Sequence, residues 1–284
     1  QRQMCIRDRV GGDLREAAQH CSLSAVGPAH RRDRGILFSV MSADHWSPAD
    51  RAVLVHGGMH TASCWDPVIP HMNVEATAIN LPGRPGAGSR PVSLDGWTDT
   101  VAEAVSSGPG GALVVAHSLG ALSVLPAISE VASRVSGVLL IATVVPASGQ
   151  CYWDLVPKIS RRMGRVWRHG QPYVLMPRPI ARHMLAHDLT AGDRERLYGQ
   201  MVPEPDAVLA APVAYEVPPD IPITYLHTLH DRVVTPRKQR GYVSALPRAT
   251  REESLDCGHS ATFSRPKDVA SVINRLARQG GAQC

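Results

Sequence analysis

The feature that most constrains the fold is a series of six short apolar runs, separated by segments with helical periodicity. Strand-like runs cover residues 51–56, 74–80, 112–116, 136–142, 223–228 and, more weakly, 250–255. Helical patterns cover residues 63–71, 94–106, 119–132, 236–245 and 266–277. Strands that are apolar along their whole length are buried on both faces. The alternation therefore predicts an α/β protein with a mostly parallel sheet of about six strands flanked by helices.

One region interrupts this alternation. Residues 145–215 contain no convincing strand, only short amphipathic stretches broken by prolines. The pattern predicts a helical cap inserted after the fourth strand and folded over the carboxyl edge of the sheet, where open α/β sheets bind ligands. The predicted division is a first core part at 41–144, the cap at 145–215 and a second core part at 216–280.

The first 40 residues are expected to be a non-native or disordered leader. Residues 1–9, QRQMCIRDR, resemble a peptide that appears when sequencing-adaptor DNA is translated in assembled metagenomic reads. Met41 is a credible start, and no charged head precedes an apolar run as in a secretory signal.

Composition excludes several other classes of protein. No run of about 18 apolar residues is present, so no membrane span is expected. The net charge of +5 gives no reason to invoke nucleic acid, and the basic stretch at 158–168 is interpreted as a solvated helix face. The six cysteines show no paired spacing, which indicates reduced thiols in a cytoplasmic protein.

The strongest local signal is the sequence VVAHSLGA at 114–121, where a strand leads through a sharp turn into a helix. It matches the nucleophile elbow G-x-S-x-G, with Ala116 in place of the first glycine. Small residues are needed there because the turn packs tightly, and alanine adds only one methyl group. The motif makes Ser118 the candidate nucleophile.

Two backbone N–H groups are candidates for an oxyanion hole, which stabilises negative charge developing on a reacting carbonyl. In this arrangement one donor is the residue after the nucleophile, here Leu119. The other comes from the loop after the first strand, HGGMH at 56–60, where Gly58 is the best candidate.

The candidate acid and base follow the last two strands. Asp231 follows the fifth strand and His259 follows the sixth, so the chain order is Ser, acid, His, as the elbow motif requires. Asp231 would orient His259 and stabilise its protonated form. Asp256 is an alternative acid, ranked lower because its nearness in sequence to His259 makes the hydrogen bond geometrically awkward.

Metal chemistry has little support in the sequence. None of the 13 histidines lies in an HExxH or similar ligand spacing. His183 and His187 share a helix face by their spacing, but two histidines are too few for a metal site. No metal or organic cofactor is expected.

With these residues in place, the chain resembles the plant methylesterase and hydroxynitrile lyase family and its bacterial esterase relatives, over about residues 51–278. The segments that carry the resemblance are LVHGGMHTASCW (54–65), LPGRPGAG (81–88), AHSLGA (116–121), HDLTAGDRERLYGQMVPEP (187–205), DRVVTPRKQ (231–239) and CGHSATFSRPKDVA (257–270). The resemblance implies the α/β-hydrolase fold, and dimerisation is frequent in the family.

Two positions separate the family's activities. Its lyases resemble a pattern with threonine at the position of Gly57 and lysine at the position of Ser260. That threonine hydroxyl helps to hold the nucleophile, and the lysine can bind a departing cyanide. Their absence favours ester hydrolysis over cyanohydrin cleavage.

The expected function is therefore that of a serine hydrolase acting on small, largely apolar carboxylic esters through an acyl-enzyme intermediate. Lactones, thioesters and amides would use the same machinery. A hydroxynitrile lyase-like enzyme and a non-catalytic ligand receptor are the alternatives. The expected apolar lid comprises Tyr152, Trp153, Met163, Trp167, Met176 and Met184. The expected substrate-binding residues are His60, His117, Trp153 and Met184.

Overall fold

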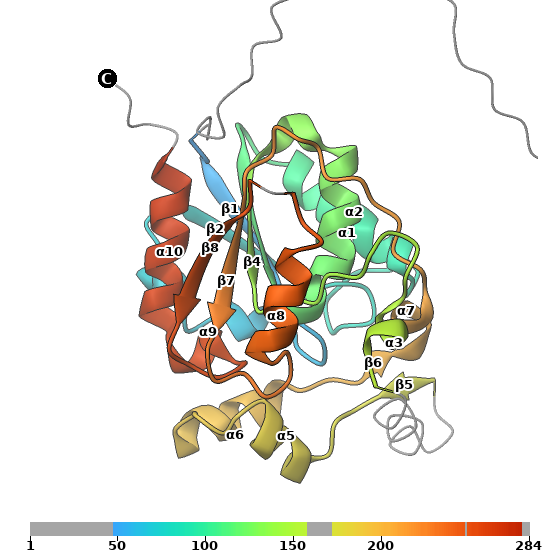
Figure 1. The fold of residues 1–284 in the computed structure, drawn as a ribbon, viewed down its shortest axis with the longest axis vertical. Helices are drawn as coiled ribbons and strands as arrows, with labels where there is room; N and C mark the ends of the chain where they lie inside the picture. The colour runs from blue at the N-terminus through green and yellow to red at the C-terminus, as the bar shows by residue number, and fades with distance from the viewer. Residues whose placement is uncertain (1–47, 158–171, 248, 280–284) are drawn as a thin grey trace, which may run out of the picture. The chain divides into compact units, whose positions relative to one another are not determined.

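Six parallel strands form the centre of the protein (Figure 1). A computed structural model describes residues 48–157, 172–247 and 249–279. The strands lie in the order β2-β1-β3-β4-β7-β8, which confirms the predicted parallel sheet. Their bounds are β1 (Arg51–Val55), β2 (Glu75–Ile79), β3 (Ala112–His117), β4 (Val135–Ile141), β7 (Ile223–Thr228) and β8 (Arg251–Leu255).

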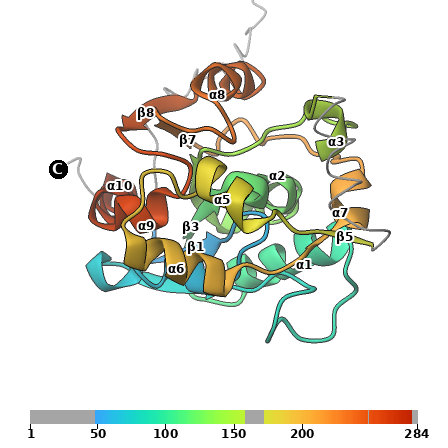
Figure 2. The same cartoon turned by 90° about the horizontal axis from the view of Figure 1, so that it is seen from below.

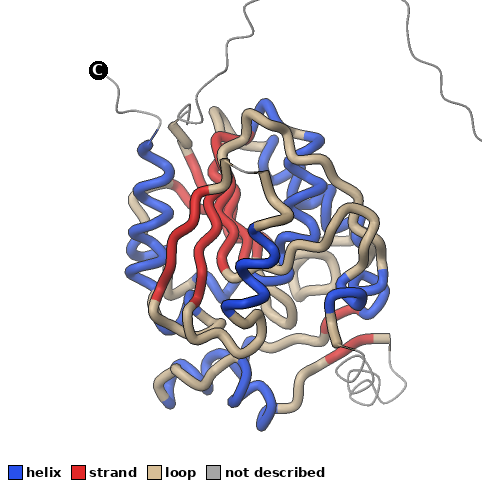
Figure 3. Tube along the Cα trace, viewed as in Figure 1, coloured by secondary structure: helices blue, strands red, loops and turns tan. Residues whose placement is uncertain are grey.

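The two faces of the sheet are covered by different helices, as the tube view shows (Figure 3). Helices α1 (Leu94–Ser106), α2 (Ala121–Glu130) and α8 (Pro236–Val243) lie on one side, and α10 (Pro266–Arg278) lies on the other. Successive strand residues point to opposite faces. In β1, Val53 packs in the apolar core that includes residues of α1 and α2, while Leu54 packs in the apolar core that includes residues of α10. Both faces of the central strands β1, β3, β4 and β7 are buried in this way, which explains why these four strands read as nearly continuous apolar runs.

The helix predicted at 63–71 is wrong in type. The structure has two short 3₁₀ turns there, η1 (Ala62–Trp65) and η2 (Ile69–His71). Pro67 and Pro70 have no backbone N–H to donate, so an α-helical hydrogen-bond ladder cannot continue through the segment.

The segment between β4 and β7, here called the β4–β7 segment (residues 142–222), supplies helices beyond the carboxyl ends of the strands. Figures 1 and 2 show α5 (Arg178–Met184) and α6 (Ala191–Gln200) across these ends. Two shorter helices, α3 (Tyr152–Leu155) and α7 (Asp206–Ala210), lie to one side. The predicted basic face at 158–168, with Met163 and Trp167, lies outside the described residues, as does the predicted boundary at residue 40.

The expectation of no strand in this segment is wrong at two short places. Strand β5 (Tyr173–Val174) pairs antiparallel with β6 (Glu204–Pro205). A two-residue strand is too short to produce an alternating pattern in a sequence. The division into core and cap at 144 and 215 stays a prediction.

The described residues bear on two predictions made from composition, those on membrane spans and on cysteines. No helix in the described ranges is long and apolar enough to cross a membrane. Cys64, Cys151 and Cys257 are free in the structure, and reduced thiols throughout the chain stay a prediction. A cytoplasmic location stays a prediction.

Candidate active site

Ser118 lies directly after β3, at the sharp turn that leads through η3 (Ser118–Gly120) into α2. Its φ angle is +51°, in the left-handed region that non-glycine residues rarely adopt. Such a conformation costs on the order of 1–3 kcal/mol and persists only where the surrounding structure enforces it. The strained turn is the geometry that the elbow motif predicts, and it holds the serine above the carboxyl end of the sheet.

Ser118, His259 and Asp231 form one hydrogen-bonded chain. His259 Nε2 lies 2.9 Å from Ser118 Oγ, and His259 Nδ1 lies 2.7 Å from Asp231 Oδ2. All three residues are buried. An ionised carboxylate only accepts hydrogen bonds, so Nδ1 carries the proton and Nε2 is left to accept the Ser118 hydroxyl proton. The structure thus brings together the three residues singled out by sequence.

Asp231 is held in place by the loop that follows β7. Its Oδ1 accepts hydrogen bonds from the backbone N–H groups of Val233 and Val234, at 2.7 and 2.8 Å. Its Oδ2 accepts one from Thr228 Oγ1 at 2.9 Å. Burial by itself would raise the pKa of Asp231, but His259 and these donors outweigh burial and hold the pKa below its ordinary value. At neutral pH Asp231 is therefore an ionised carboxylate beside His259.

The two predicted oxyanion donors lie next to each other. Gly58 and Leu119 both line the cavity that contains Ser118 and His259. A Cβ placed on Gly58 would lie 2.4 Å from Leu119 Cδ1, so the Leu119 side chain packs directly against Gly58. Their N–H groups as oxyanion donors stay a prediction.

The loop that carries Gly58 is fixed by a buried carboxylate that sequence reasoning missed. Met59 has a φ angle of +59°, and its N–H donates to Glu204 Oε2 at 2.5 Å. Glu204 belongs to β6 and pairs with Arg84, whose Nη2 lies 2.7 Å from both carboxylate oxygens. Both side chains are fully buried. Arg84 Nε also donates to the carbonyl of His60, so the pair joins three segments around the loop.

Three buried histidines near Ser118 are neutral. Burial is the main cause that lowers the pKa of His56 and His117 to about 3 and that of His60 to about 4. His56 accepts the Leu81 N–H at Nε2, and its Nδ1–H donates to the Gly57 carbonyl. His117 and His60 likewise bond to backbone carbonyls, so within the described residues only the His259 ring lies within hydrogen-bonding distance of Ser118 Oγ.

The cavity beside Ser118 has a volume of about 80 Å³. Its wall is largely apolar and includes the predicted lid residues Tyr152 and Met176. Lys238 is the one Asp, Glu, Lys or Arg side chain among its described lining residues. A cavity of this size is small beside the roughly 300–1,000 Å³ of sites for drug-sized ligands.

None of the four predicted substrate-binding residues lines this cavity. His117 turns its Nε2–H to the carbonyl of His259 at 2.9 Å, and His60 turns Nδ1–H to the carbonyl of Gly58 at 2.7 Å. Trp153 donates its indole N–H to Asp206. Met184, the last residue of α5, does not line the cavity, whereas Leu185, the residue that follows the helix, does.

The remaining candidates lie away from the Ser118–His259 pair. Asp256 Oδ1 lies 2.5 Å from His230 Nε2, so Asp256 is not the partner of His259. His183 Nδ1 lies 3.1 Å from Arg232 Nη1. Within the described ranges, no three His, Cys, Asp or Glu side chains are grouped so as to hold a metal ion.

Comparison with known proteins gives relatives named as hydrolases and esterases. The pyrethroid hydrolase of Sphingobium wenxiniae is 23% identical over 248 residues, which is 79% of this chain and 86% of that protein. The probable esterase PIR7A of Oryza sativa is 26% identical over 261 residues, covering 79% of this chain and 95% of that protein.

Solved structures show the same fold at low sequence identity. An extracellular α/β-hydrolase from a Paenibacillus species has a TM-score of 0.71 at 19% identity, covering 82% of this chain and 99% of that one. The methylesterase MES16 from Arabidopsis has a TM-score of 0.66 at 21% identity, covering 79% and 97%. These neighbours agree with the resemblance to methylesterases found in the sequence.

A sequence profile of the alpha/beta hydrolase family matches residues 52–272, from β1 to the middle of α10. Apart from Arg51 at the start of β1, that range contains the six strands of the sheet, and it contains the three residues of the Ser118–His259–Asp231 chain. The chain belongs to the alpha/beta hydrolase family.

Proposed function

We propose that this protein is a serine hydrolase that cleaves carboxylic esters of small, largely apolar substrates through an acyl-enzyme intermediate. The observation that carries the proposal is the buried chain of hydrogen bonds from Ser118 through His259 to Asp231. A serine hydroxyl is a weak nucleophile until a base accepts its proton. Here the base lies within hydrogen-bonding distance and its other nitrogen is fixed by a carboxylate.

The proposed reaction has two acyl-transfer steps. Ser118 Oγ attacks the ester carbonyl while His259 Nε2 takes the hydroxyl proton, and the N–H groups of Gly58 and Leu119 stabilise the oxyanion. His259 then gives that proton to the leaving alcohol oxygen as the carbon–oxygen bond breaks. In the second step His259 takes a proton from water, which attacks the acyl-enzyme, and returns that proton to Ser118 as the acid leaves.

Substrate size and polarity follow from the cavity wall. Apolar side chains from three parts of the chain, Val144, Leu155 and Val233, line the space beside Ser118. A cavity of about 80 Å³ accommodates a short acyl or alcohol group, with the rest of the ester directed outward. The names of the relatives, a pyrethroid hydrolase and a probable esterase, support an ester as the substrate.

Cyanohydrin cleavage is disfavoured by the same two positions that separate the family's activities. A Cβ on residue 57 would lie 2.9 Å from both Ser118 Cβ and His117 Nδ1, so a threonine does not fit there without rearrangement. Ser260 is buried and carries no charge that could bind cyanide.

The test is release of p-nitrophenol from acetate, butyrate and octanoate esters, with Ser118→Ala as the control. We expect the variant to lose activity by roughly 10⁴–10⁶-fold, as when a triad nucleophile is removed. Mandelonitrile is assayed in parallel for release of cyanide. Equal rates for the wild type and the variant on every ester would refute the proposal, and binding of an ester without turnover would support a receptor.

A further inference from the structure

The short loop after β8 that carries His259 is held by hydrogen bonds to its backbone. The carbonyl of Cys257 accepts the N–H of His230 at 2.9 Å, and the carbonyl of His259 accepts Nε2–H of His117 at 2.9 Å. The N–H of Gly258 donates to Asp188 Oδ2 at 2.6 Å. His230 and His117 follow or end strands of the sheet, whereas Asp188 belongs to the β4–β7 segment.

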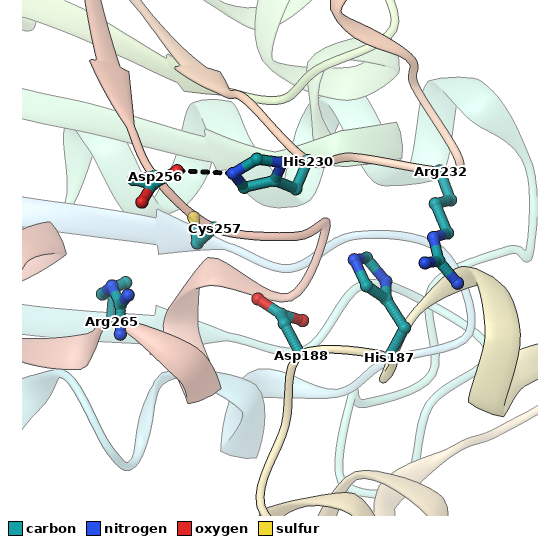
Figure 4. A pocket seen from close by; sticks show the side chains of 7 residues that line it. All are labelled: His187, Asp188, His230, Arg232, Asp256, Cys257 and Arg265. Atoms are coloured by element: carbon teal, nitrogen blue, oxygen red, sulfur yellow. Dashed lines mark hydrogen bonds and ion pairs between the residues drawn. The ribbon is translucent and has the colours of Figure 1, made fainter.

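Asp188 lies between α5 and α6, and its carboxylate contacts the backbone of the loop that follows β8. Figure 4 shows its side chain beside Cys257, on the wall of a polar cavity of about 430 Å³ that also contains Asp256 and Arg265. The contact with the loop is close. A Cβ added to Gly258 would lie 2.5 Å from Asp188 Oδ1, so only glycine lets the carboxylate approach this backbone.

We propose that Asp188 is a positioning residue for His259, and that it acts through the backbone N–H of Gly258. A carboxylate that accepts a backbone N–H makes a short, charge-assisted bond, roughly twice as strong as a neutral one. This bond fixes the Cys257–Gly258 peptide, one peptide unit ahead of the one that joins Gly258 to His259, and so helps set the direction of the imidazole between Ser118 and Asp231. The inference rests on the proposed role of His259 as the base.

The position of Asp188 in the chain gives this bond a second consequence. Met176 and Leu185 of the same segment line the cavity beside Ser118. One segment therefore both covers the substrate cavity and holds the loop that carries the base. A shift of that segment would disturb His259 as well as the cavity wall.

Three variants separate this role from a merely structural one. Asp188→Ala removes the acceptor, whereas Asp188→Asn keeps a carbonyl oxygen that can accept the Gly258 N–H. Asp256→Ala is the matched control. Asp256 is an exposed carboxylate that lines the same polar cavity and is closer in sequence to His259 than Asp188 is. Among the described residues its side chain bonds only to the His230 side chain. For each variant, kcat and KM are measured on p-nitrophenyl acetate, and circular dichroism checks the fold.

We expect Asp188→Ala to lower kcat by about 10–100-fold with little change in KM, since a misplacement on the order of 1 Å costs about that much. Asp188→Asn should recover most of the loss, and Asp256→Ala should match the wild type. Wild-type kcat in Asp188→Ala, or a loss in Asp188→Asn equal to that in Asp188→Ala, would overturn the inference.

A readout independent of activity distinguishes failure of this inference from failure of the proposed function. The downfield proton resonance of His259 Nδ1–H reports the hydrogen bond to Asp231 directly. It should broaden or shift in Asp188→Ala and remain in Asp256→Ala, even if no ester is hydrolysed. An unchanged resonance in folded Asp188→Ala would show that Asp188 does not position His259.

Discussion

Replacing Gly57 with alanine would test how tightly the nucleophile turn is packed. The added methyl group would lie 2.9 Å from Ser118 Cβ and from His117 Nδ1, and 3.2 Å from the His117 carbonyl oxygen. Optimal contacts between such atoms are about 3.5–4.0 Å, so the neighbours must move apart by roughly half an ångström. None of these atoms is at the end of a flexible side chain, because His117 is buried and hydrogen-bonded to His259.

The cost of this overpacking is about 1–3 kcal/mol of unfolding free energy. Since the methyl group presses directly on Ser118, we also expect kcat to fall by about 10²-fold, as for a comparable misplacement of a reacting group. Unfolding in urea gives the stability, and hydrolysis of p-nitrophenyl acetate gives kcat.

Gly192→Ala provides the matched control. Gly192 lies in α6, and no heavy atom lies within 4 Å of a Cβ placed there. Alanine should stabilise that helix by about 0.5–1 kcal/mol and leave kcat unchanged. If Gly57→Ala had the stability and kcat of the wild type, the close packing around Ser118 would be refuted.

Three further predictions follow from the site. First, the pKa of Asp231 lies below its unfolded value of about 3.9, so the contribution of the ionised carboxylate to the free energy of unfolding is complete above that pH and is lost as the pH falls through the folded pKa. Urea unfolding of Asp231→Asn should lack this acid-dependent loss, and a pH profile equal to that of the wild type would contradict the prediction. Second, Glu204→Ala should lower the free energy of unfolding by about 3–5 kcal/mol because it leaves the buried Arg84 without its carboxylate partner, and the double variant Arg84→Met, Glu204→Met should recover much of that loss. Thermal unfolding measures both variants, and equal losses of stability in the two would contradict the prediction. Third, kcat/KM should fall from the acetate to the octanoate ester because the cavity beside Ser118 has a volume of only about 80 Å³. A rise of kcat/KM with chain length would show that this cavity does not limit the size of the substrate.

The sheet was predictable because its four central strands, β1, β3, β4 and β7, are buried on both faces. Val53 and Leu54 are neighbours in sequence, yet they serve opposite cores, and this produces a continuous apolar run. The two turns at 62–71 could not be distinguished from a helix by apolar spacing, although Pro67 and Pro70 argued against one. Strands β5 and β6 are too short to leave any periodic signal.

The Ser118–His259–Asp231 group was predictable because strands of a parallel sheet end at one edge, and each residue follows a strand. Asp188 and Glu204 were not predictable, because their partners are backbone N–H groups 70 and 145 residues away in the chain. Sequence motifs describe side chains, whereas these contacts depend on where the β4–β7 segment lies. The end of α5 depends on the same placement, and it is Leu185, just after the helix, and not Met184 that lines the cavity.

In the proposed reaction Ser118 forms the covalent intermediate. A p-nitrophenyl phosphonate ester tests it most directly, since it mimics the tetrahedral intermediate and leaves a stable adduct on the nucleophile. We expect release of one equivalent of p-nitrophenol, one phosphonyl group on the peptide that contains Ser118, and neither event in Ser118→Ala. An ester-hydrolysing enzyme that is labelled at another residue, or is not labelled at all, would contradict it.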